Sequence, residues 1–408
     1  MVAGEASGDA LAAELVVALR SALIERLARP TSDPQPVSTG LAPEFFGAGG
    51  PRMSAAGVEL VADTTVHAVV GLSEVIRELK TYWRLYRSLL SMAEARQPDL
   101  IVLVDSSGFN LRLAAALRRR VQAQRGTFGN WTPRLVYYVS PQVWASRAGR
   151  VLGMARDLDL VLSIFPFEPA WYAERVPGLR VKFVGHPLIE RHRGEQVETR
   201  ADREAGSIPL VLLLPGSRTQ EVRRHLPVMV ETVQTLMWKR AIRARLVVPN
   251  DRMLLESRRY TTAVAGLETR VGGLGGSLAE ADVALACSGT VTLECALYGV
   301  PSVVMYRASW PTYLVARQLV QVRHLAMPNL LAGERIYPEL IQGEVTAENV
   351  TREALDLLMN GERRAQIRAK LTRVVASLGA WGASRRAAAA VVDLLEQGTP
   401  SMRAGLRG

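Results

Sequence analysis

Short apolar runs alternate along this chain with longer segments of helical periodicity. The runs have the length of buried strands, and the segments between them have the length of helices. Because parallel strands need a crossover connection, this alternation predicts an α/β protein with parallel sheets flanked by helices. Six such runs are Leu100–Val104, Leu135–Val139, Leu160–Ile164, Leu210–Leu214, Arg245–Pro249 and Val283–Ala286.

The chain of 408 residues is too long for a single hydrophobic core, so two domains are expected. A composition of 48% hydrophobic and 22% charged residues is that of a folded protein rather than a disordered one. Between His192 and Ser207 the sequence becomes charged and loses its strand pattern, which indicates the junction of two α/β halves. A cleft between the halves is the expected site.

The net charge of +11 predicts an acidic partner, and nucleic acid, an anionic lipid surface and a phosphorylated substrate all fit it. Aromatic residues make up 6% and do not interleave the arginine clusters as a base-stacking platform would, which argues against nucleic acid. The N-terminus lacks a signal-peptide pattern, and no apolar run approaches the roughly 18 residues of a spanning helix. Cys287 and Cys295 sit in apolar surroundings, which favours buried reduced thiols and a cytoplasmic protein.

Two turns follow buried strands and are rich in small and hydroxyl residues. Ser288, Gly289 and Thr290 come after Val283–Ala286, where the N-terminus of the next helix would attract a diphosphate; an ordinary capped helix is the alternative. Glu294, one turn further, could accept from ribose hydroxyls. Leu210–Leu214 leads into Pro215-Gly216-Ser217-Arg218, which offers a guanidinium for phosphate oxygens. Two such turns predict a pocket for a nucleoside diphosphate.

A series of motifs runs through nearly the whole chain in a fixed order. They are Ala3 to Asp9, Gly47 to Met53, Asp105 to Asn110, Tyr138 to Ala145, Phe165 to Glu168, Gly185-His186-Pro187, Leu214 to Arg218, Ser288 to Glu294 and Pro328 to Gly333. In these motifs the chain resembles the lipid-A-disaccharide synthases, inverting glycosyltransferases of the GT-B type that use a UDP-sugar.

The resemblance implies two Rossmann-like domains whose parallel sheets face a central cleft. An acceptor-binding domain would span 1–190, a UDP-sugar-binding domain 191–375, and C-terminal crossover helices with a tail 376–408, the helices returning to the N-terminal domain. One departure stands out: only Met1 and Val2 precede the Ala-Gly-Glu turn, so a central strand is almost missing. Either the start is truncated or the sheet is incomplete.

The implied reaction joins UDP-2,3-diacylglucosamine to 2,3-diacylglucosamine 1-phosphate (lipid X) and releases UDP. Asp105 ends a strand at the carboxyl edge, where spacing alone favours a turn-capping aspartate, and the resemblance implies that it is the base. Gly108 stands where many relatives are expected to carry an acid. Glu5, Ser7 and Asp9 would line the acceptor side, although Ser7 or Asp9 fits a helix N-cap equally well. On the donor side, Arg218, Asn329 and Gln342 are carried over as phosphate or donor contacts.

No cofactor or metal is expected. Asp157-Leu158-Asp159 looks like a metal motif but runs into a strand, and the resembled family needs no divalent ion. His186 is read equally well as a proton carrier or as a packed hinge residue.

The stretch Leu72–Leu90 places an apolar stripe beside Arg77, Lys80, Arg84 and Arg87, as in a helix that lies on a membrane. With an acylated substrate, this predicts a cytoplasmic enzyme held peripherally on the anionic inner membrane. The sequence is compatible with a homodimer and does not decide the oligomeric state. The alternatives are another GT-B enzyme of UDP-N-acetylglucosamine, namely a peptidoglycan-precursor transferase or a 2-epimerase, and a non-catalytic binder of anionic lipid.

Overall fold

The computed structural model describes residues 1–27, 42–64, 72–124, 126, 131–191, 207–262, 264–320 and 322–397. The chain forms two compact units. Unit 1 comprises Met1–Pro187 together with Gly379–Gly408, and unit 2 comprises Leu188–Leu378. The domain boundaries expected from the sequence lie at residues 190 and 375. The junction that it expected, residues 192–206, lies outside the described part of the chain.

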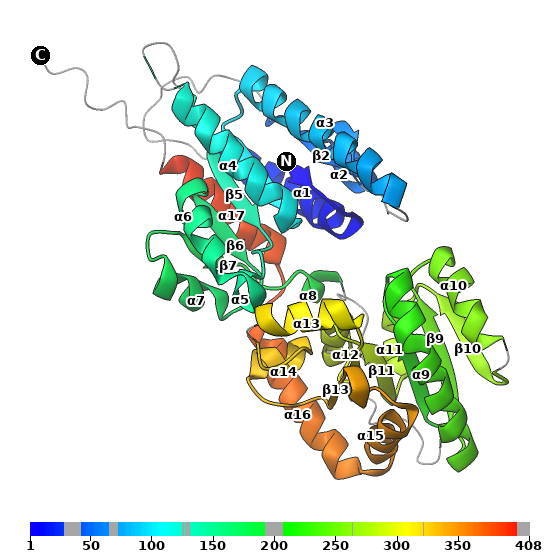
Figure 1. The fold of residues 1–408 in the computed structure, drawn as a ribbon. Helices are drawn as coiled ribbons and strands as arrows, with labels where there is room; N and C mark the ends of the chain where they lie inside the picture. The colour runs from blue at the N-terminus through cyan, green and yellow to red at the C-terminus, as the bar shows by residue number, and fades with distance from the viewer. Residues whose placement is uncertain are drawn as a thin grey trace, which may run out of the picture. The chain divides into compact units, whose positions relative to one another are not determined.

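Unit 1 is built on a parallel sheet of seven strands (Figure 1). The spatial order is β3-β2-β1-β4-β5-β6-β7, so the order reverses between β1 and β4. The inner strands are continuous apolar runs because helices cover both faces of a parallel sheet. The strands are β1 (Val2–Ala3), β2 (Phe46–Gly49), β3 (Glu59–Asp63), β4 (Leu100–Val104), β5 (Arg134–Tyr138), β6 (Leu160–Ser163) and β7 (Val181–Phe183).

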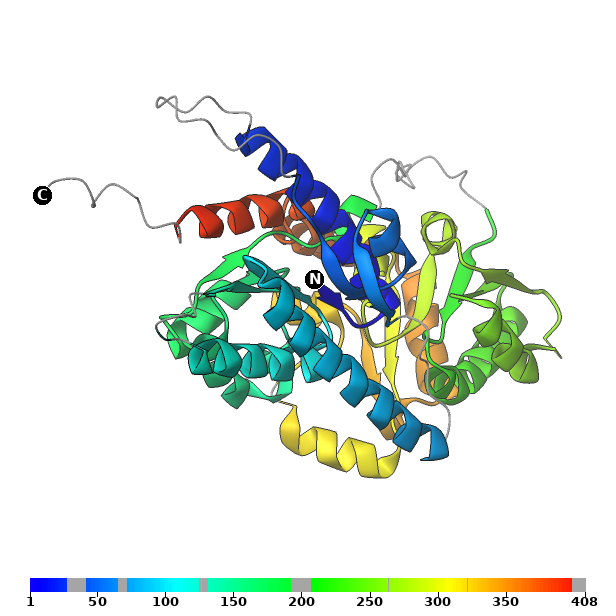
Figure 2. The same ribbon diagram turned by 90° about the horizontal axis from the view of Figure 1, so that it is seen from above.

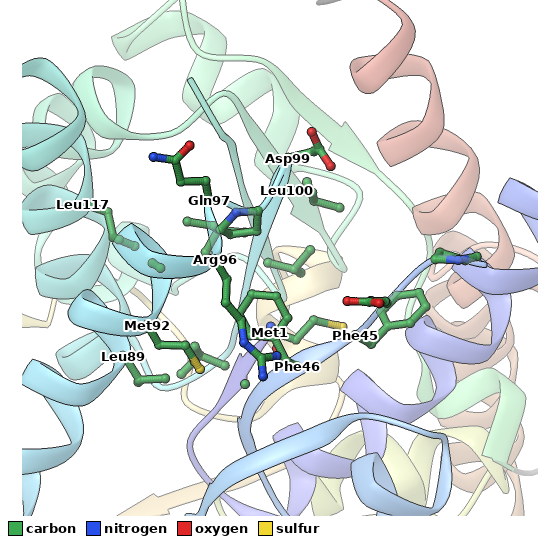
Figure 3. Close-up of a pocket in the computed structure, with 18 of the residues that line it drawn as sticks. Met1, Phe45, Phe46, Leu89, Met92, Arg96, Gln97, Asp99, Leu100 and Leu117 are labelled. Atoms are coloured by element: carbon green, nitrogen blue, oxygen red, sulfur yellow. Dashed lines mark hydrogen bonds between the residues drawn. The ribbon is translucent and has the colours of Figure 1, made fainter. Parts of the chain in front are cut away.

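From the sequence, the central strand of the first sheet is expected to be almost missing. The structure contains this strand, β1, but it is only two residues long. Val2 pairs with Ala48 of β2 and with Leu103 of β4, so β1 bridges the two halves of the sheet. On the amino side of β1, a cavity of about 550 Å³ opens between β2 and β4, with Phe46, Leu89 and Leu100 in its wall (Figure 3). This cavity lies at the end of the sheet opposite the carboxyl edge, and none of the predicted site residues lines it.

Two helical layers cover the sheet of unit 1. On one face Leu113 and Tyr172 join a core with Leu135 and Tyr137, and on the other Leu15 and Val391 join a core with Val136 and Tyr138. The first layer contains α3 (Leu72–Arg96), α4 (Ser107–Ala123), α6 (Val151–Asp157) and α7 (Glu168–Arg175), and the second α1 (Ala6–Leu27), α2 (Pro51–Ala55) and α17 (Ala383–Glu396). A short helix α5 (Val143–Ser146) and a 3₁₀ turn (Ala148–Arg150) lead into α6.

The last helix, α17, packs against α1 after the chain has passed through the whole of unit 2 (Figure 2). Ala387, Ala388 and Ala390 let α17 come close to the sheet and to Leu15. The predicted return of the C-terminal helical segment to the N-terminal domain is therefore confirmed.

Unit 2 repeats the same plan with six parallel strands in the order β10-β9-β8-β11-β12-β13. The reversal here falls between β8 and β11. The strands are β8 (Leu210–Leu214), β9 (Arg243–Val248), β10 (Leu267–Val271), β11 (Val283–Cys287), β12 (Ser302–Tyr306) and β13 (Glu339–Ile341). With two parallel sheets each flanked by helices, the predicted α/β class is confirmed.

The helices of unit 2 fall into two main groups. In one, α9 packs against α10 and α15; in the other, α12, α14 and α16 contact one another. Their bounds are α8 (Leu188–Arg191), α9 (Thr219–Lys239), α10 (Asp251–Thr261), α11 (Leu274–Glu280), α12 (Val291–Leu297), α13 (Trp310–Leu319), α14 (Met327–Ala332), α15 (Ala347–Met359) and α16 (Gly361–Ser377), with a 3₁₀ turn at Gln342–Glu344. Over the described residues, no helix combines the length and the apolarity that a bilayer span requires.

Candidate functional site

Each sheet has one switch point, and most of the predicted site residues lie there. In an open α/β sheet, ligands bind outside the carboxyl ends of the strands where the strand order reverses. Glu5 and Asp105 follow β1 and β4 in unit 1, and Arg218 and Ser288 follow β8 and β11 in unit 2. The sequence motifs thus belong to two half-sites, one on each unit.

Asp105 occupies a strained turn at the switch point of unit 1. Both Asp105 (φ +51°) and Ser106 (φ +46°) adopt the left-handed conformation. Non-glycine residues pay on the order of 1–3 kcal/mol each for such a backbone and keep it only when neighbours enforce it. Here Asn110 enforces it, since its amide Nδ2 donates to the carbonyls of Val104 (3.0 Å) and Asp105 (2.8 Å). The Tyr137 hydroxyl donates to the Asp105 carbonyl as well.

The Asp105 turn and the Gly4 turn are packed tightly together. A Cβ atom on Gly4 would lie 2.5 Å from the Ser106 Oγ, so only glycine fits there. The half-buried Asp105 carboxylate accepts no hydrogen bond from the described residues. The alternative of a side chain that caps its own turn is therefore not what the structure contains. A carboxylate in this state can contact a ligand.

The three acidic-turn residues after β1 differ in their surroundings. Glu5 and Ser7 are exposed at the start of α1. Asp9 is buried, and its carboxylate accepts from the backbone amides of Gly50 (2.8 Å), Arg52 (3.0 Å) and Met53 (3.0 Å). Asp9 thus caps α2, a helix 41 residues away, rather than its own helix. Asp9 therefore has a structural role in unit 1, because both of its carboxylate oxygens accept backbone amides near the start of α2.

In unit 2, the turn after β11 is held from both sides. The Ser288 amide donates to the Met305 carbonyl (2.9 Å) and the Ser288 Oγ donates to the Leu325 carbonyl (2.8 Å). Gly289 has a φ of +147°, and a Cβ there would meet open space. Thr290 is exposed, and Glu294 is half-buried one turn further on. Ser288 itself is anchored, while Gly289 and Thr290 face an open region at the start of α12.

The turn after β8 carries its own acid. The Glu221 carboxylate accepts from the amides of Ser217 (2.9 Å) and Arg218 (3.2 Å), the two residues that precede α9. Gly216 is required, because its φ is +118° and a Cβ would lie 2.3 Å from a Glu221 oxygen. The Arg218 side chain is 76% exposed, and its guanidinium makes only a long contact of 3.9 Å with the Glu221 carboxylate. Arg218 is therefore able to reach a ligand.

Two predicted donor contacts are structural in the observed fold. Asn329 is fully buried: its Oδ1 accepts from Ile336 and Tyr337, and its Nδ2 donates to Tyr337 and Glu339. All of its hydrogen-bonding capacity is used. Gln342, in the left-handed region at φ +53°, pairs with the backbone of Ala308 through both amide atoms (2.6 and 3.2 Å). Their contacts do not support the direct ligand roles assigned from the sequence.

Three polar side chains that the sequence motifs did not single out hold segments together, one of them half-buried (Glu339) and two buried (His225 and Glu168). Glu339 accepts from the amides of Leu325 and Ala326 and thereby holds the loop beside Ser288. His225 links α9 to the end of β12, because its Nε2 accepts from the Arg307 amide at 3.0 Å. Burial lowers the pKa of His225, and its Nδ1 lies 2.9 Å from the Glu221 carbonyl, to which the neutral ring donates. No local sequence pattern identifies such long-range partners.

The third missed residue is Glu168, which is fully buried. The Trp144 indole donates to its Oε1 (3.0 Å) and the Phe165 amide to its Oε2 (3.3 Å). Burial raises the pKa of the Glu168 carboxyl from 4.5 to about 7. The Phe165-Pro166-Phe167-Glu168 motif is the only signal that could have pointed to it.

Asp157 and Asp159 are used in ion pairs. Asp157 pairs with Arg156 (2.7 and 2.8 Å), and Asp159 pairs with Arg118 (2.7 Å). His186 is buried with its ring 5.4 Å from that of Phe165. Cys287 and Cys295 are free buried thiols, and burial raises the pKa of each to about 12. In the described part of the chain, no cluster of acidic, histidine and cysteine side chains has the makings of a metal site.

Comparison with known proteins identifies the family. A family model described as lipid-A-disaccharide synthetase matches residues 1–393. The chain belongs to the lipid-A-disaccharide synthase family. Among its relatives, the lipid-A-disaccharide synthase of Solibacter usitatus is 36% identical over 407 residues, 97% of this chain and 96% of that protein. The lipid-A-disaccharide synthase of Myxococcus xanthus is 38% identical and covers 98% and 97%. The predicted family, enzyme class and glycosyltransferase role in lipid A biosynthesis are confirmed.

Solved structures share the fold of this lipid-A-disaccharide synthase family member. A UDP co-structure of MnaA from S. aureus has a TM-score of 0.57 at 12% identity and covers 95% of both chains. A glycosyltransferase of kitacinnamycin has a TM-score of 0.51 at 18% identity and covers 96% of this chain and 97% of that one. At these identities the likeness concerns the fold alone, and it agrees with the predicted GT-B class.

Proposed function

We propose that this chain transfers a diacylglucosaminyl group from UDP-2,3-diacylglucosamine to 2,3-diacylglucosamine 1-phosphate with inversion, releasing UDP. Unit 1 takes the acceptor and unit 2 takes the donor. The half-site around Asp105 carries the proposal, because its carboxylate accepts no hydrogen bond from the described residues and stands at a sheet switch point in a turn that Asn110 and Tyr137 enforce.

In the acceptor half, Asp105 acts as the general base on the attacking hydroxyl. As the donor C1 becomes oxocarbenium-like, the acceptor oxygen must lose its proton, and a positioned carboxylate accelerates this transfer by roughly 10²–10⁴-fold. The exposed Glu5 and Ser7 border the same edge and contact the acceptor. Asp9 supports them by fixing the start of α2.

In the donor half, the departing diphosphate needs positive charge and hydrogen-bond donors. The Gly289 and Thr290 turn supplies backbone donors beside an open space, Arg218 supplies a guanidinium, and Glu294 accepts from the ribose. Ser288, Asn329 and Gln342 position this half-site through the contacts described above. These groups provide the charge stabilisation without a metal, so the absence of a metal requirement is part of the proposal.

We propose further that α3 holds the enzyme on an anionic membrane surface. Trp83 is 59% exposed and Tyr82 is 48% exposed, and the Arg87 guanidinium lies over the Trp83 ring at 6.0 Å. Exposed aromatic rings flanked by bases are typical of an interfacial helix. An acylated acceptor resides in the bilayer, so an enzyme on its surface meets the acceptor without extracting it into water.

Release of UDP from the two lipid substrates tests the reaction. Asp105→Asn is expected to lose turnover by at least about a hundredfold while UDP affinity stays unchanged. Asparagine tolerates the left-handed backbone, so the turn is kept. Asp99→Asn, at the exposed start of the same strand, is the matched control and should keep full activity. A fully active Asp105→Asn would transfer the role of base to Glu5.

A further inference from the structure

A groove of about 390 Å³ lies between α4 and α6 in unit 1. It begins at Ser107 and Gly108, which directly follow the Asp105 turn, so one end of the groove adjoins the candidate base. Its floor is apolar, with Leu111 and Met154 among the lining residues, whereas Arg112 and Arg150 bring charge from two separate elements. A groove with this lining suits a ligand that carries one anionic group.

Three arginines come together here without acidic partners. Arg150 is half-buried, and burial, followed by the nearby guanidinium groups of Arg147 and Arg112, lowers its pKa. Among the residues that the structure describes, none of the three makes an ion pair. By contrast, Arg156 in the same groove is held by Asp157 at 2.7 and 2.8 Å. Arg112 and Arg147 are exposed, and like charges beside the half-buried Arg150 cost free energy unless an anion offsets them.

The local backbone adds to this positive potential. α4 is 17 residues long, and its N-cap residue, Ser106, makes no side-chain cap hydrogen bond. The positive end of the helix dipole is therefore not neutralised by its own cap. A Cβ on Gly108 would meet nothing within 4 Å, which leaves the space in front of the first turn open.

We propose that this groove binds a phosphomonoester through Arg112 and Arg150, with Arg147 in support. Guanidinium groups suit this ligand because their N–H donors match two phosphate oxygens at once. Resting on the proposed function, the ligand is the 1-phosphate of the acceptor. The acceptor hydroxyl that attacks is the one on C6, and the ring carbons that carry the phosphate and C6 both flank the ring oxygen, so anchoring the phosphate fixes the position of the hydroxyl.

The contacts of Tyr137 connect the groove to the reacting end of the acceptor. Its hydroxyl donates to the Asp105 carbonyl, and the same phenolic group interacts electrostatically with Arg150. Through Tyr137, a phosphate bound at Arg150 is thus connected to the turn between β4 and α4 that holds the base. Arg112 and Arg150 are positioning residues in this scheme, since they act on the phosphate and not on the bond that forms.

Calorimetry with phosphorylated acceptor in the absence of donor tests the groove without turnover. Arg112→Gln and Arg150→Gln are each expected to weaken acceptor binding about tenfold or more, with UDP affinity unchanged. Arg150→Lys should recover part of the loss. Arg156→Gln is the matched control, which removes one charge from the same groove but from an ion-paired arginine, and it should bind normally. Wild-type affinity in both test variants would overturn the proposal.

Two further measurements separate the alternatives. Acceptor that lacks the phosphate should bind equally to wild type and variants, and an equal loss on that compound would overturn the phosphate assignment. Vesicles of phosphatidylglycerol test whether the arginines serve lipid headgroups: a loss of vesicle binding with unchanged affinity for a short-chain soluble acceptor would also overturn it. Thermal unfolding of Arg150→Gln should occur no lower than in wild type, because no ion pair is lost. If this binding pattern is observed but the protein does not transfer the sugar, the proposed reaction is contradicted and the phosphate site is not.

Discussion

The Arg218 side chain stands exposed at the end of β8, with only a long contact to Glu221. Arg218→Ala and Glu294→Ala are each expected to weaken UDP binding roughly tenfold or more, since each removes a charged hydrogen-bond partner. Calorimetry with UDP measures this. Arg223→Ala serves as the control, because Arg223 is occupied by Glu256 at 2.7 Å. Unchanged UDP affinity in both test variants would remove the proposed diphosphate contacts.

Glu168 makes the stability of unit 1 depend on pH. Burial raises the pKa of its carboxyl from 4.5 to about 7, so the unfolded chain releases the proton first as pH rises. The contribution of protonated Glu168 is complete below pH 4.5 and is lost as pH rises through about 7, a change on the order of 3 kcal/mol. Most of the loss falls between pH 5 and 8.

Urea unfolding at pH 5 and pH 8 tests this dependence. Glu168→Gln is expected to reduce the difference in unfolding free energy between the two pH values, since glutamine does not titrate. Glu174→Gln changes a 72% exposed side chain on the same helix and should leave the difference as in wild type. An undiminished pH dependence in Glu168→Gln would mean that another group is responsible.

Two of the predicted site residues, Asp9 and Asn329, bind backbone groups that lie outside their own motifs. Asp105 could be predicted, because a carboxylate that directly follows a buried strand must lie at the sheet edge. Asp9 could not, since whether it faces a ligand or caps α2 depends on Gly50, 41 positions away. Asn329 likewise looks available until burial and its hydrogen bonds to Ile336 and Tyr337 are known.

At the scale of elements, α3 has the strongest consequence for function. Replacing its four bases with glutamine is expected to reduce sedimentation with phosphatidylglycerol vesicles and to leave UDP binding intact, because each base near such a surface contributes about 1 kcal/mol, weakened by salt. The bases are Arg77, Lys80, Arg84 and Arg87, of which Arg84 and Arg87 are exposed, while the side chains of Arg77 and Lys80 lie outside the described residues.

A variant with the same loss of charge on unit 2 is the control for α3. It replaces exposed bases at Lys239, Arg252, Arg258 and Arg259. Equal vesicle binding by wild type and the α3 variant, at low and at moderate salt, would show that α3 only covers the core. An equal loss in both variants would trace the binding to net charge.

The strands were predictable because a parallel strand between two helical layers is apolar along its whole length. Leu100–Val104 and Leu210–Leu214 were found with their observed bounds. The central strand β1 was not, since two residues cannot form a pattern; its identity as a strand comes from the ladders that it makes with β2 and β4. Helix bounds depend on caps, and α3 extends to Arg96, beyond the predicted Leu90.

At the scale of the molecule, the two repeated sheets were foreseeable from the alternation of runs, and the return of α17 from the family resemblance. The return itself leaves only a weak mark in the sequence. Ala387 to Ala390 reads as an ordinary alanine-rich helix, and only the structure reveals that it completes the core around Leu15 and Val136. Alanine side chains allow a helix to approach many different surfaces closely, so the sequence of α17 does not identify the surface that it covers.

The return of α17 to unit 1 determines the order in which the two units can finish folding during synthesis. The ribosome releases residues 1–187 first, but the face of their sheet that α17 covers stays bare until residue 394 has emerged. Unit 2 is continuous in sequence, so it holds all of its own core before that moment. The half that is made first is thus the half that finishes last, and through most of synthesis its exposed apolar face is a target for chaperones and for self-association.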